Sequence, residues 1–223
     1  MPNEFEHRSI ELERLDRGDY TPIEYARWQR EMFFIHRLLG EQRALFRAME
    51  PNTTTEGLSV LEVGAGSGDL LRSFKRRARH DINRFIGSDG SFEAAKSIQA
   101  KGCEAVQCNG LQLPFADNAF DVVYSSLTLH HFADADAVIL LEEMRRVARK
   151  SVIVVDLRRS RLAYRLYRIF GKLLLQPFTY EDGSLSIKRS FTQNELVSLA
   201  ERAGFSSVEV YRSVAFRIVM RGI

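Results

Sequence analysis

The chain has 223 residues, of which 45% are hydrophobic and 27% are charged, and its formal net charge is +3. This composition is ordinary for a globular protein, and the charge is too small to indicate a nucleic-acid partner by itself. A chain of this length can bury a sizeable core, so we expect one large domain.

The cysteines and the N-terminus exclude further classes. The two cysteines, Cys103 and Cys108, have no neighbouring histidine, whereas disulfide frameworks and zinc sites normally need more ligands. We therefore expect reduced cysteines and no metal. The N-terminus is polar, unlike a signal peptide, and no apolar run is long enough to cross a bilayer. The sequence thus predicts a cytoplasmic protein.

The N-terminal quarter of the chain predicts helices. From Pro22 the spacing of apolar residues predicts a long helix, with Thr21 as its N-cap and a break near Gly40. The Pro-, Asn- and Thr-rich segment 51–55 is expected to end this helix. We expect residues 1–56 to form a helical cap.

Strands and helices then alternate, which predicts a parallel sheet covered on both faces. Strands are expected at residues 58–63, 84–89, 104–109, 120–126 and 151–157, and helices at 67–79, 91–101 and 134–149. Ser91 and Asp134 are expected to cap two of these helices.

The end of the chain breaks this alternation. A basic helical stretch at 160–175 precedes a capped helix that stops at Gly204. The segments 206–213 and 214–221 then predict two strands joined by a very short link, which must be antiparallel. The expected fold class is α/β, with a mostly parallel sheet and an antiparallel C-terminal hairpin.

The first strand leads into a glycine-rich turn, VLEVGAGSG at residues 60–68. Gly64 and Gly66, at the start of a helix, let the backbone approach a ligand closely. The dinucleotide fingerprint G-x-G-x-x-G has its third glycine where this chain has Asp69, and Glu62 lies directly before the turn. Both carboxylates would repel a pyrophosphate, but not a ligand that carries an ammonium and a sulfonium.

This turn resembles motif I of the class I S-adenosylmethionine-dependent methyltransferases. FIGSDGS at residues 85–91 resembles their second strand, and residues 109–132 are similar to their third-loop and fourth-strand segment. The resemblance implies a three-layer αβα Rossmann-like sandwich with a seven-stranded sheet over residues 57–223. It also implies S-adenosylmethionine as the cofactor.

The resemblance assigns roles to the residues of these motifs. Glu62 is expected to face the ammonium of the cofactor, Asp89 to accept from both ribose hydroxyls, and Asn109 to bind the adenine edge. The common form of the motif has Asp at position 109, but an amide still offers a donor and an acceptor. The predicted cofactor-binding set is Glu62, Gly64, Ala65, Gly66, Asp89, Gly90, Asn109, Gly110, Leu111 and Ser125.

The residues after the fourth strand are candidates for catalysis, because such sheets bind ligands beyond the carboxyl ends of their strands. His130 and His131 lie there, and a histidine has the right pKa range to deprotonate a phenol. The alternative is that one histidine only packs or touches the cofactor. Asp156 and Arg158, after the fifth strand, are second-rank candidates, and His36 is expected to be structural.

Two aromatic-rich segments indicate a flat, apolar acceptor, with helix packing as the alternative. The N-terminal helix and a predicted lid at residues 157–191 supply Tyr20, Tyr25, Trp28, Met32, Phe33, Tyr164, Tyr167, Phe170, Phe178 and Tyr180. Residues 158–172 contain six basic side chains and no acid. This pattern is typical of a solvated lid, which we favour, or of a helix in weak contact with an anionic membrane surface.

The two ends of the chain resemble a bacterial group of small quinone-methylase-like enzymes. TPIEYARW and DGSLSIKRSFTQNELVSLAERAGF carry much of this resemblance. It implies O- or C-methylation of a phenol, quinone or related small molecule, with Ser186, Arg189 and Ser190 near the acceptor. We expect a monomer or a homodimer.

Two other functions stay open. An RNA or protein methyltransferase would use the same cofactor. The chain, however, has no appended nucleic-acid module, and SSLTLHHF stands in place of the Asn/Asp-Pro-Pro-aromatic loop that acts on amino groups of bases. A non-catalytic subunit would bind the cofactor without transferring a methyl group. We therefore expect a small-molecule acceptor and no nucleic acid.

Overall fold

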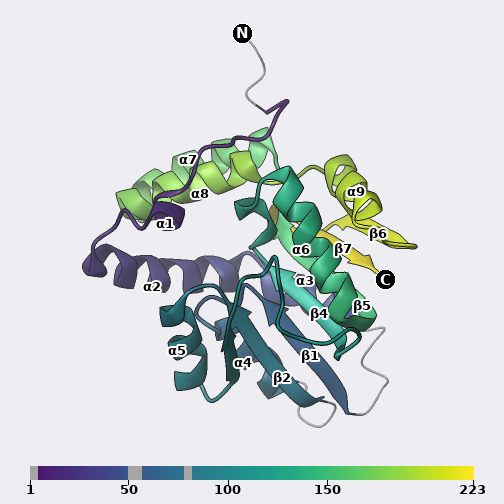
Figure 1. Ribbon diagram of the computed structural model, residues 1–223. Helices are drawn as coiled ribbons and strands as arrows, with labels where there is room; N and C mark the ends of the chain where they lie inside the picture. Colours follow the sequence, from purple (N-terminus) through teal and green to yellow (C-terminus); the bar gives the residue numbers. More distant parts are fainter. Residues whose placement is uncertain (1–4, 50–56, 78–81) are drawn as a thin grey trace.

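The computed structural model describes residues 5–49, 57–77 and 82–223. These residues contain a seven-stranded sheet with the order β3-β2-β1-β4-β5-β7-β6 (Figure 1). The strands are β1 (Leu58–Val63), β2 (Ile82–Asp89), β3 (Glu104–Gln107), β4 (Phe120–Ser126), β5 (Ala148–Leu157), β6 (Val208–Arg212) and β7 (Arg217–Gly222). Strands β1 to β5 run parallel, and β7 is antiparallel to β5 and β6. The predicted fold class is confirmed.

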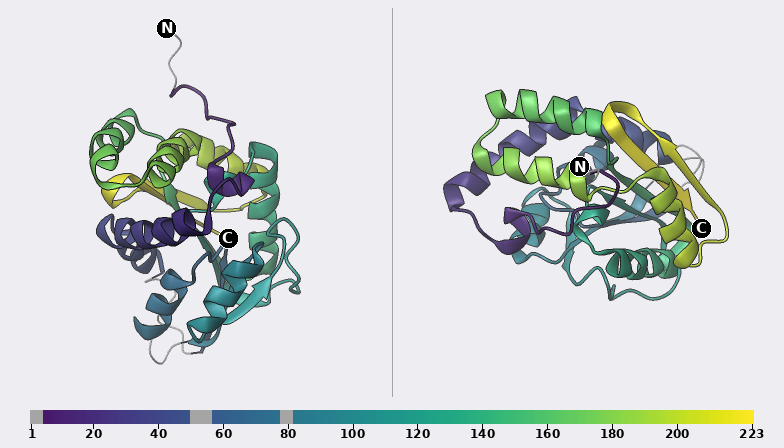
Figure 2. Two further views of the ribbon diagram at one scale, coloured as in Figure 1. Left: turned by 90° about the vertical axis from the view of Figure 1, so that its left-hand side faces the viewer. Right: turned by 90° about the horizontal axis from the view of Figure 1, so that it is seen from above.

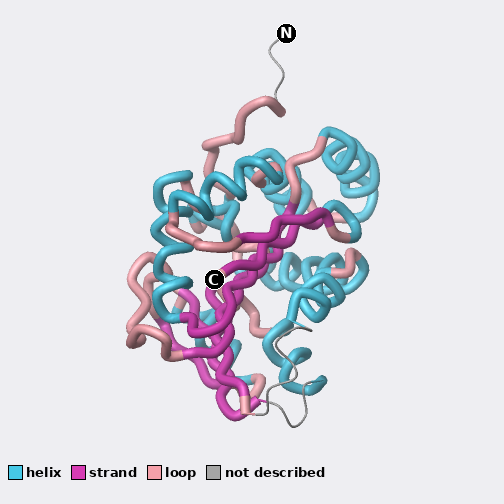
Figure 3. The backbone as a smooth tube through the Cα atoms, turned by 90° about the vertical axis from the view of Figure 1, so that its right-hand side faces the viewer, coloured by secondary structure: helices cyan, strands magenta, loops and turns pink. Residues whose placement is uncertain are grey.

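Helices cover both faces of this sheet (Figure 3), because its central strands are apolar on both sides. One face is covered by α3 (Glu41–Met49), α4 (Asp69–Arg77) and α5 (Phe92–Ala100). The other is covered by α6 (Asp134–Val147) and α9 (Gln193–Arg202). Leu71 and Tyr124 are fully buried in the first core, and Leu141 is fully buried in the second.

Four helices form a cap beyond the carboxyl ends of the parallel strands (Figures 1 and 2). The N-terminal part supplies α1 (Arg14–Arg17) and α2 (Pro22–Leu38), and the connection from β5 to α9 supplies α7 (Arg161–Leu174) and α8 (Pro177–Arg189). In the described part of the chain no helix is both long and apolar enough to span a bilayer.

The predicted break in the N-terminal helix is confirmed. The Thr21 hydroxyl accepts from the backbone N–H of Glu24, and the Glu24 carboxylate accepts from the N–H of Thr21, so α2 begins with a capping box. Gly40, with φ of +73°, separates α2 from α3. The predicted end of this region at residues 51–55 lies outside the described residues.

The ends of α6 differ from the prediction. The N-cap is Ala133, and the carboxylate of Asp134 instead forms an ion pair with Arg8. The prediction that Asp134 caps this helix is therefore wrong, because a residue far along the chain occupies its side chain. The helix ends at Val147 because residues 148–150 extend β5.

Candidate functional site

The glycine-rich turn follows β1 and is held against β2. The backbone N–H groups of Gly64 and Ala65 both donate to the carbonyl of Ser88. Gly64 has φ of +74°, and a Cβ there would lie 2.4 Å from the Thr128 hydroxyl. Gly66 has φ of +51°, and a Cβ there would meet nothing within 4 Å. The turn therefore exposes backbone beside an open space, as a ligand-binding turn requires.

The carboxylate of Asp89 is fixed by the backbone on both sides. One oxygen accepts from the N–H of Gly66 at 2.8 Å, and the other accepts from the N–H of Ser91 at 2.9 Å. Each carboxylate oxygen keeps a further lone pair, so both can still accept from a pair of neighbouring hydroxyls. Its position at the end of β2 is the predicted one.

Glu62 is a buried acid at the end of β1. Its side chain is 2% exposed and accepts a 2.8 Å hydrogen bond from the hydroxyl of Tyr124. Burial raises the pKa of Glu62 well above its usual value, an effect that the Tyr124 hydrogen bond only partly offsets. A cation beside it would stabilise the carboxylate.

Two connected hollows meet at this turn. The smaller, about 250 Å³, lies between β1, β2 and the loop after β3, and is lined by Asp89, Gly90, Asn109 and Gly110 among others. The larger, about 880 Å³, runs from Glu62 and the glycine turn into the cap. Gly64, Asp89, Thr128 and His131 line both, so one elongated ligand can occupy the two spaces.

Three members of the predicted set differ from the others in their surroundings. The side-chain oxygen of Asn109 accepts from the N–H of Leu111 at 3.0 Å, which closes a turn. Leu111 packs against the core, and Ser125 is fully buried in the sheet. Neither Leu111 nor Ser125 lines either hollow. The structure thus gives them no direct place in the site, whereas Asn109 keeps its amide group for a ligand.

His130 is oriented by Asp156, which makes two of the predicted candidates one unit. The ring Nδ1 lies 2.6 Å from one carboxylate oxygen of Asp156, and the backbone N–H of His130 donates to the other at 3.1 Å. Burial alone would raise the pKa of Asp156, but the His130 ring and the N–H donors hold it below its usual value. A carboxylate on Nδ1 directs Nε2 toward other groups.

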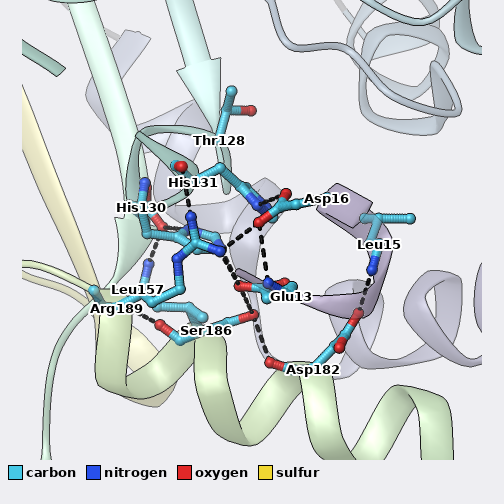
Figure 4. A network of polar contacts seen from close by, with 12 residues as sticks. Glu13, Leu15, Asp16, Thr128, His130, His131, Leu157, Asp182, Ser186 and Arg189 are labelled. Carbon is cyan, nitrogen blue, oxygen red and sulfur yellow. Dashed lines mark hydrogen bonds and ion pairs between the residues drawn. The ribbon is translucent and has the colours of Figure 1, made fainter. Parts of the chain in front are cut away.

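The N-terminal strap, residues 5–19, supplies a second carboxylate to His130. Glu13 is 3% exposed, and its Oε1 lies 3.9 Å from Nε2 of His130 (Figure 4). The same oxygen accepts from the hydroxyl of Ser186 at 2.9 Å. Burial raises the pKa of Glu13 to about 7, although His131 and Arg189 oppose this. His130 is thus enclosed between two acids.

His131 is paired with the same strap. Its Nδ1 lies 2.8 Å from the carboxylate of Asp16, which also forms an ion pair with Arg189. Burial would raise the pKa of Asp16, but these two partners lower it. Arg189 also donates to the carbonyl of His131 at 2.5 Å (Figure 4). Arg189 therefore fixes the strap against the histidine turn. It lines neither of the two hollows.

Glu13, His130 and His131 also form a group with metal-ligand composition. Each offers one ligand atom, and these atoms lie within 4.8 Å of one another. The guanidinium of Arg189, however, lies 3.7 Å from Glu13 and competes for its carboxylate. A cation at this group would therefore compete with Arg189 for the Glu13 carboxylate.

The larger hollow is lined by part of the predicted aromatic set. Tyr20, Tyr25, Trp28, Met32, Phe33, Tyr167 and Phe170 line it, whereas Tyr164, Phe178 and Tyr180 do not. Tyr20, Tyr25 and Trp28 stack in sequence, at centroid distances of 5.0 and 5.6 Å. The buried ring of Phe178 supports this stack from behind.

The floor of this hollow carries polar groups that the sequence did not reveal. Arg217 is 1% exposed, lines the hollow and has no ion-pair partner among the described residues. His36, which was expected to be structural, also lines it, 3.3 Å from the carboxylate of Glu41. Burial lowers the pKa of both His36 and Arg217. His36 and Arg217 lie far apart in the sequence, so no local motif indicated that they line the same hollow.

The groups around the turn fit an S-adenosyl ligand. Glu62 offers a carboxylate to an ammonium, Asp89 offers two acceptors to ribose hydroxyls, and Asn109 offers an amide to a base edge. With the seven-stranded sheet, this arrangement defines a class I S-adenosylmethionine-dependent methyltransferase.

The comparisons with known proteins give the family. The family described as "Methyltransferase domain" matches residues 61–155. The chain is 30% identical over 177 residues to the ubiquinone/menaquinone biosynthesis C-methyltransferase UbiE of Burkholderia cenocepacia, covering 70% of each chain. It is also 30% identical over 175 residues to the protein of the same name from Hahella chejuensis, again covering 70% of each. The chain therefore belongs to the S-adenosylmethionine-dependent methyltransferase family.

Solved structures show the same fold. A SAM-dependent methyltransferase from Aquifex aeolicus superposes with a TM-score of 0.63 at 18% identity, covering 84% of this chain and 90% of that one. The magnesium protoporphyrin IX methyltransferase of Synechocystis, with bound S-adenosylhomocysteine, gives a TM-score of 0.64 at 16% identity, covering 93% and 97%.

Proposed function

We propose that this enzyme methylates an oxygen or carbon atom of a small, apolar aromatic or quinone-like acceptor, with His130 as the general base. One observation carries the proposal: a single hollow joins the cofactor turn at Glu62 and Gly64 to His130 and to the stacked aromatic side chains. An acceptor ring can therefore lie among aromatic side chains while its reacting atom faces the cofactor.

The chemistry assigned to the protein is positioning and proton removal. When bound, S-adenosylmethionine supplies a methyl group that is already activated by a sulfonium. Nε2 of His130 takes the proton that the acceptor loses as the new bond to carbon forms, and Asp156 stabilises the resulting imidazolium. The Glu13 carboxylate faces the same Nε2, and its pKa is raised to about 7, so it can accept this proton and pass it onward.

The cap is assigned to the acceptor. Residues 1–56, where described, and residues 157–191 supply most of the aromatic lining, while residues 57–156 supply the cofactor turn. Ser186 lines the hollow, but Ser190 is fully buried and lies outside it. The name of the Burkholderia relative, a ubiquinone/menaquinone biosynthesis C-methyltransferase, supports a quinone-like acceptor.

The proposal is tested by release of S-adenosylhomocysteine with a panel of acceptors. We expect turnover with alkylated hydroquinones and phenols, and none with RNA oligonucleotides or peptides, since the aromatic lining suits a flat apolar ring. Cofactor binding without release for every acceptor would support the non-catalytic subunit, and turnover confined to RNA or peptide would overturn the proposal.

A further inference from the structure

Helix α7 carries two parallel stripes on its outer surface. Large apolar side chains recur at Leu162, Leu166, Ile169 and Leu173, which is helical spacing, and all four are exposed. A basic residue directly precedes each of them, namely Arg161, Arg165, Arg168 and Lys172. The helix contains no acid. A basic stripe beside an exposed apolar stripe is typical of helices that lie on anionic bilayers.

The basic residues of this segment divide into two groups. Arg159 is buried in an ion pair with Glu195, and Arg158 lines the large hollow. The side chains of these two residues are therefore used inside the molecule and are not available to an outside partner. The four basic side chains of α7 are exposed, so they are available to an outside partner.

Helix α2 exposes large apolar side chains as well. Phe34 and Leu38 on that helix are 66% and 84% exposed, and Leu173 on α7 is 79% exposed. In the left view of Figure 2, α7 lies above α2 on the same side of the molecule. Several large exposed apolar side chains on two helices of the same side of the molecule mark an interaction site rather than ordinary solvent-facing surface.

Part of this surface also borders the acceptor hollow. Phe170 and Leu174 on α7 and Phe33 and Leu38 on α2 are exposed and also line that hollow. A side chain that is exposed to solvent and also lines the hollow lies at an opening of that hollow. The opening between α2 and α7 is thus bordered by apolar side chains, which favours entry of an apolar molecule.

We propose that the membrane-docking face, formed by the outer side of α7 and by Phe33, Phe34 and Leu38 of α2, binds an anionic lipid bilayer and receives the acceptor from it. The apolar side chains enter the acyl boundary, and the adjacent basic side chains contact anionic headgroups. The docking itself stands on the surface alone, whereas the delivery of an acceptor rests on the proposed function. A second copy of the chain fits less well, because two identical basic stripes would repel each other.

The docking is tested by flotation of the purified protein with vesicles. One set is phosphatidylcholine alone, and the other contains one part phosphatidylglycerol to two parts phosphatidylcholine. We expect binding to the anionic vesicles and loss of binding in the double variant Ile169→Glu, Leu173→Glu. The matched control is Ile139→Glu, an apolar-to-acid change on α6, which should bind like wild type.

The charge contribution is tested with Arg161→Gln, Arg165→Gln, Lys172→Gln. Each neutralised charge should weaken binding to anionic vesicles about fivefold, so the triple variant loses on the order of a hundredfold. Calorimetric binding of S-adenosylhomocysteine, unchanged in every variant, shows that the fold is intact. Equal flotation of wild type and the Ile169→Glu, Leu173→Glu variant would overturn the proposal. So would a dimer that this variant dissociates in the absence of vesicle binding.

Delivery is tested by comparing a hydroquinone with a long alkyl chain, presented in vesicles, with a water-soluble one. The Ile169→Glu, Leu173→Glu variant should slow only the vesicle-borne reaction. Equal slowing of both reactions would contradict delivery from the membrane. Absence of turnover with either acceptor, together with intact flotation, would reject the proposed function while the docking stands.

Discussion

At the residue scale, Gly64 and Gly66 show how similar glycines differ in their surroundings. Both have positive φ, so alanine at either position is strained by about 1–2 kcal/mol. At Gly64 the new Cβ would also lie 2.4 Å from Thr128, while at Gly66 it would enter open space. The clash is therefore confined to Gly64.

We expect Gly64→Ala to lower the free energy of unfolding by about 1–3 kcal/mol more than Gly66→Ala, because it adds overpacking to the same backbone strain. Urea denaturation of the two variants measures this difference. Equal losses would show that Thr128 moves aside without cost.

Glu13 gives a pH-dependent prediction. Its folded-state pKa of about 7 exceeds the usual 4.5, so the folded protein holds this proton more tightly than the unfolded chain does. Stability from this group is therefore full below pH 4.5 and falls by up to about 3 kcal/mol as the pH rises to 7. Relative to wild type, Glu13→Gln should gain stability over this range.

Denaturation in urea at both ends of that pH range checks this prediction. Glu11→Gln is the matched control, since Glu11 lies exposed on the same strap. A stability difference between Glu13→Gln and wild type that does not change with pH would contradict the assigned pKa.

At the element scale, Arg8 fastens the strap over the histidine turn. Its guanidinium donates to the carbonyls of His130 and Phe132 at 3.1 and 3.0 Å, and lies 3.6 Å from the centre of the Phe191 ring. The strap positions Glu13 through these contacts. The position of the strap therefore depends on Arg8, a residue that lies outside any helix.

We expect Arg8→Ala to lower kcat about 10- to 100-fold, because a displaced strap misplaces Glu13 beside His130. S-adenosylhomocysteine binding should stay unchanged, since among the described residues no hydrogen bond or ion pair joins the strap to Gly66 or Asp89. Arg17→Ala, on the exposed side of the strap, should leave turnover unaltered. Steady-state kinetics would contradict this account if both variants behaved alike.

Local sequence signals predicted most helices and strands. The features that these signals did not predict are determined by contacts between residues far apart in the sequence. The Thr21 side chain caps the start of α2, and Gly40 breaks the helix through its positive φ, so local sequence sufficed there. Asp134 has the composition of an N-cap, yet an ion pair with Arg8, 126 positions away, determines its role. Sequence periodicity carries no information about such a partner.

At the scale of the whole molecule, the cofactor end of the site is predictable from the sequence, whereas the acceptor end depends on long-range contacts. Glu62, Gly64 and Asp89 lie at strand ends, so the topology alone brings them together. Asp16 meets His131 across 115 positions, and Arg217 reaches the floor of the hollow from the last strand. The cap is assembled by tertiary packing of the N-terminal part against the connection from β5 to α9, which no local pattern specifies.

The most direct test of the central claim is single-turnover methyl transfer to an alkylated hydroquinone by wild type and by His130→Gln, with cofactor binding measured by calorimetry on the same samples. We expect His130→Gln to bind S-adenosylmethionine like wild type and to transfer the methyl group about 10²–10⁴-fold more slowly. Transfer by His130→Gln at the wild-type rate would contradict the assignment of His130 as the base.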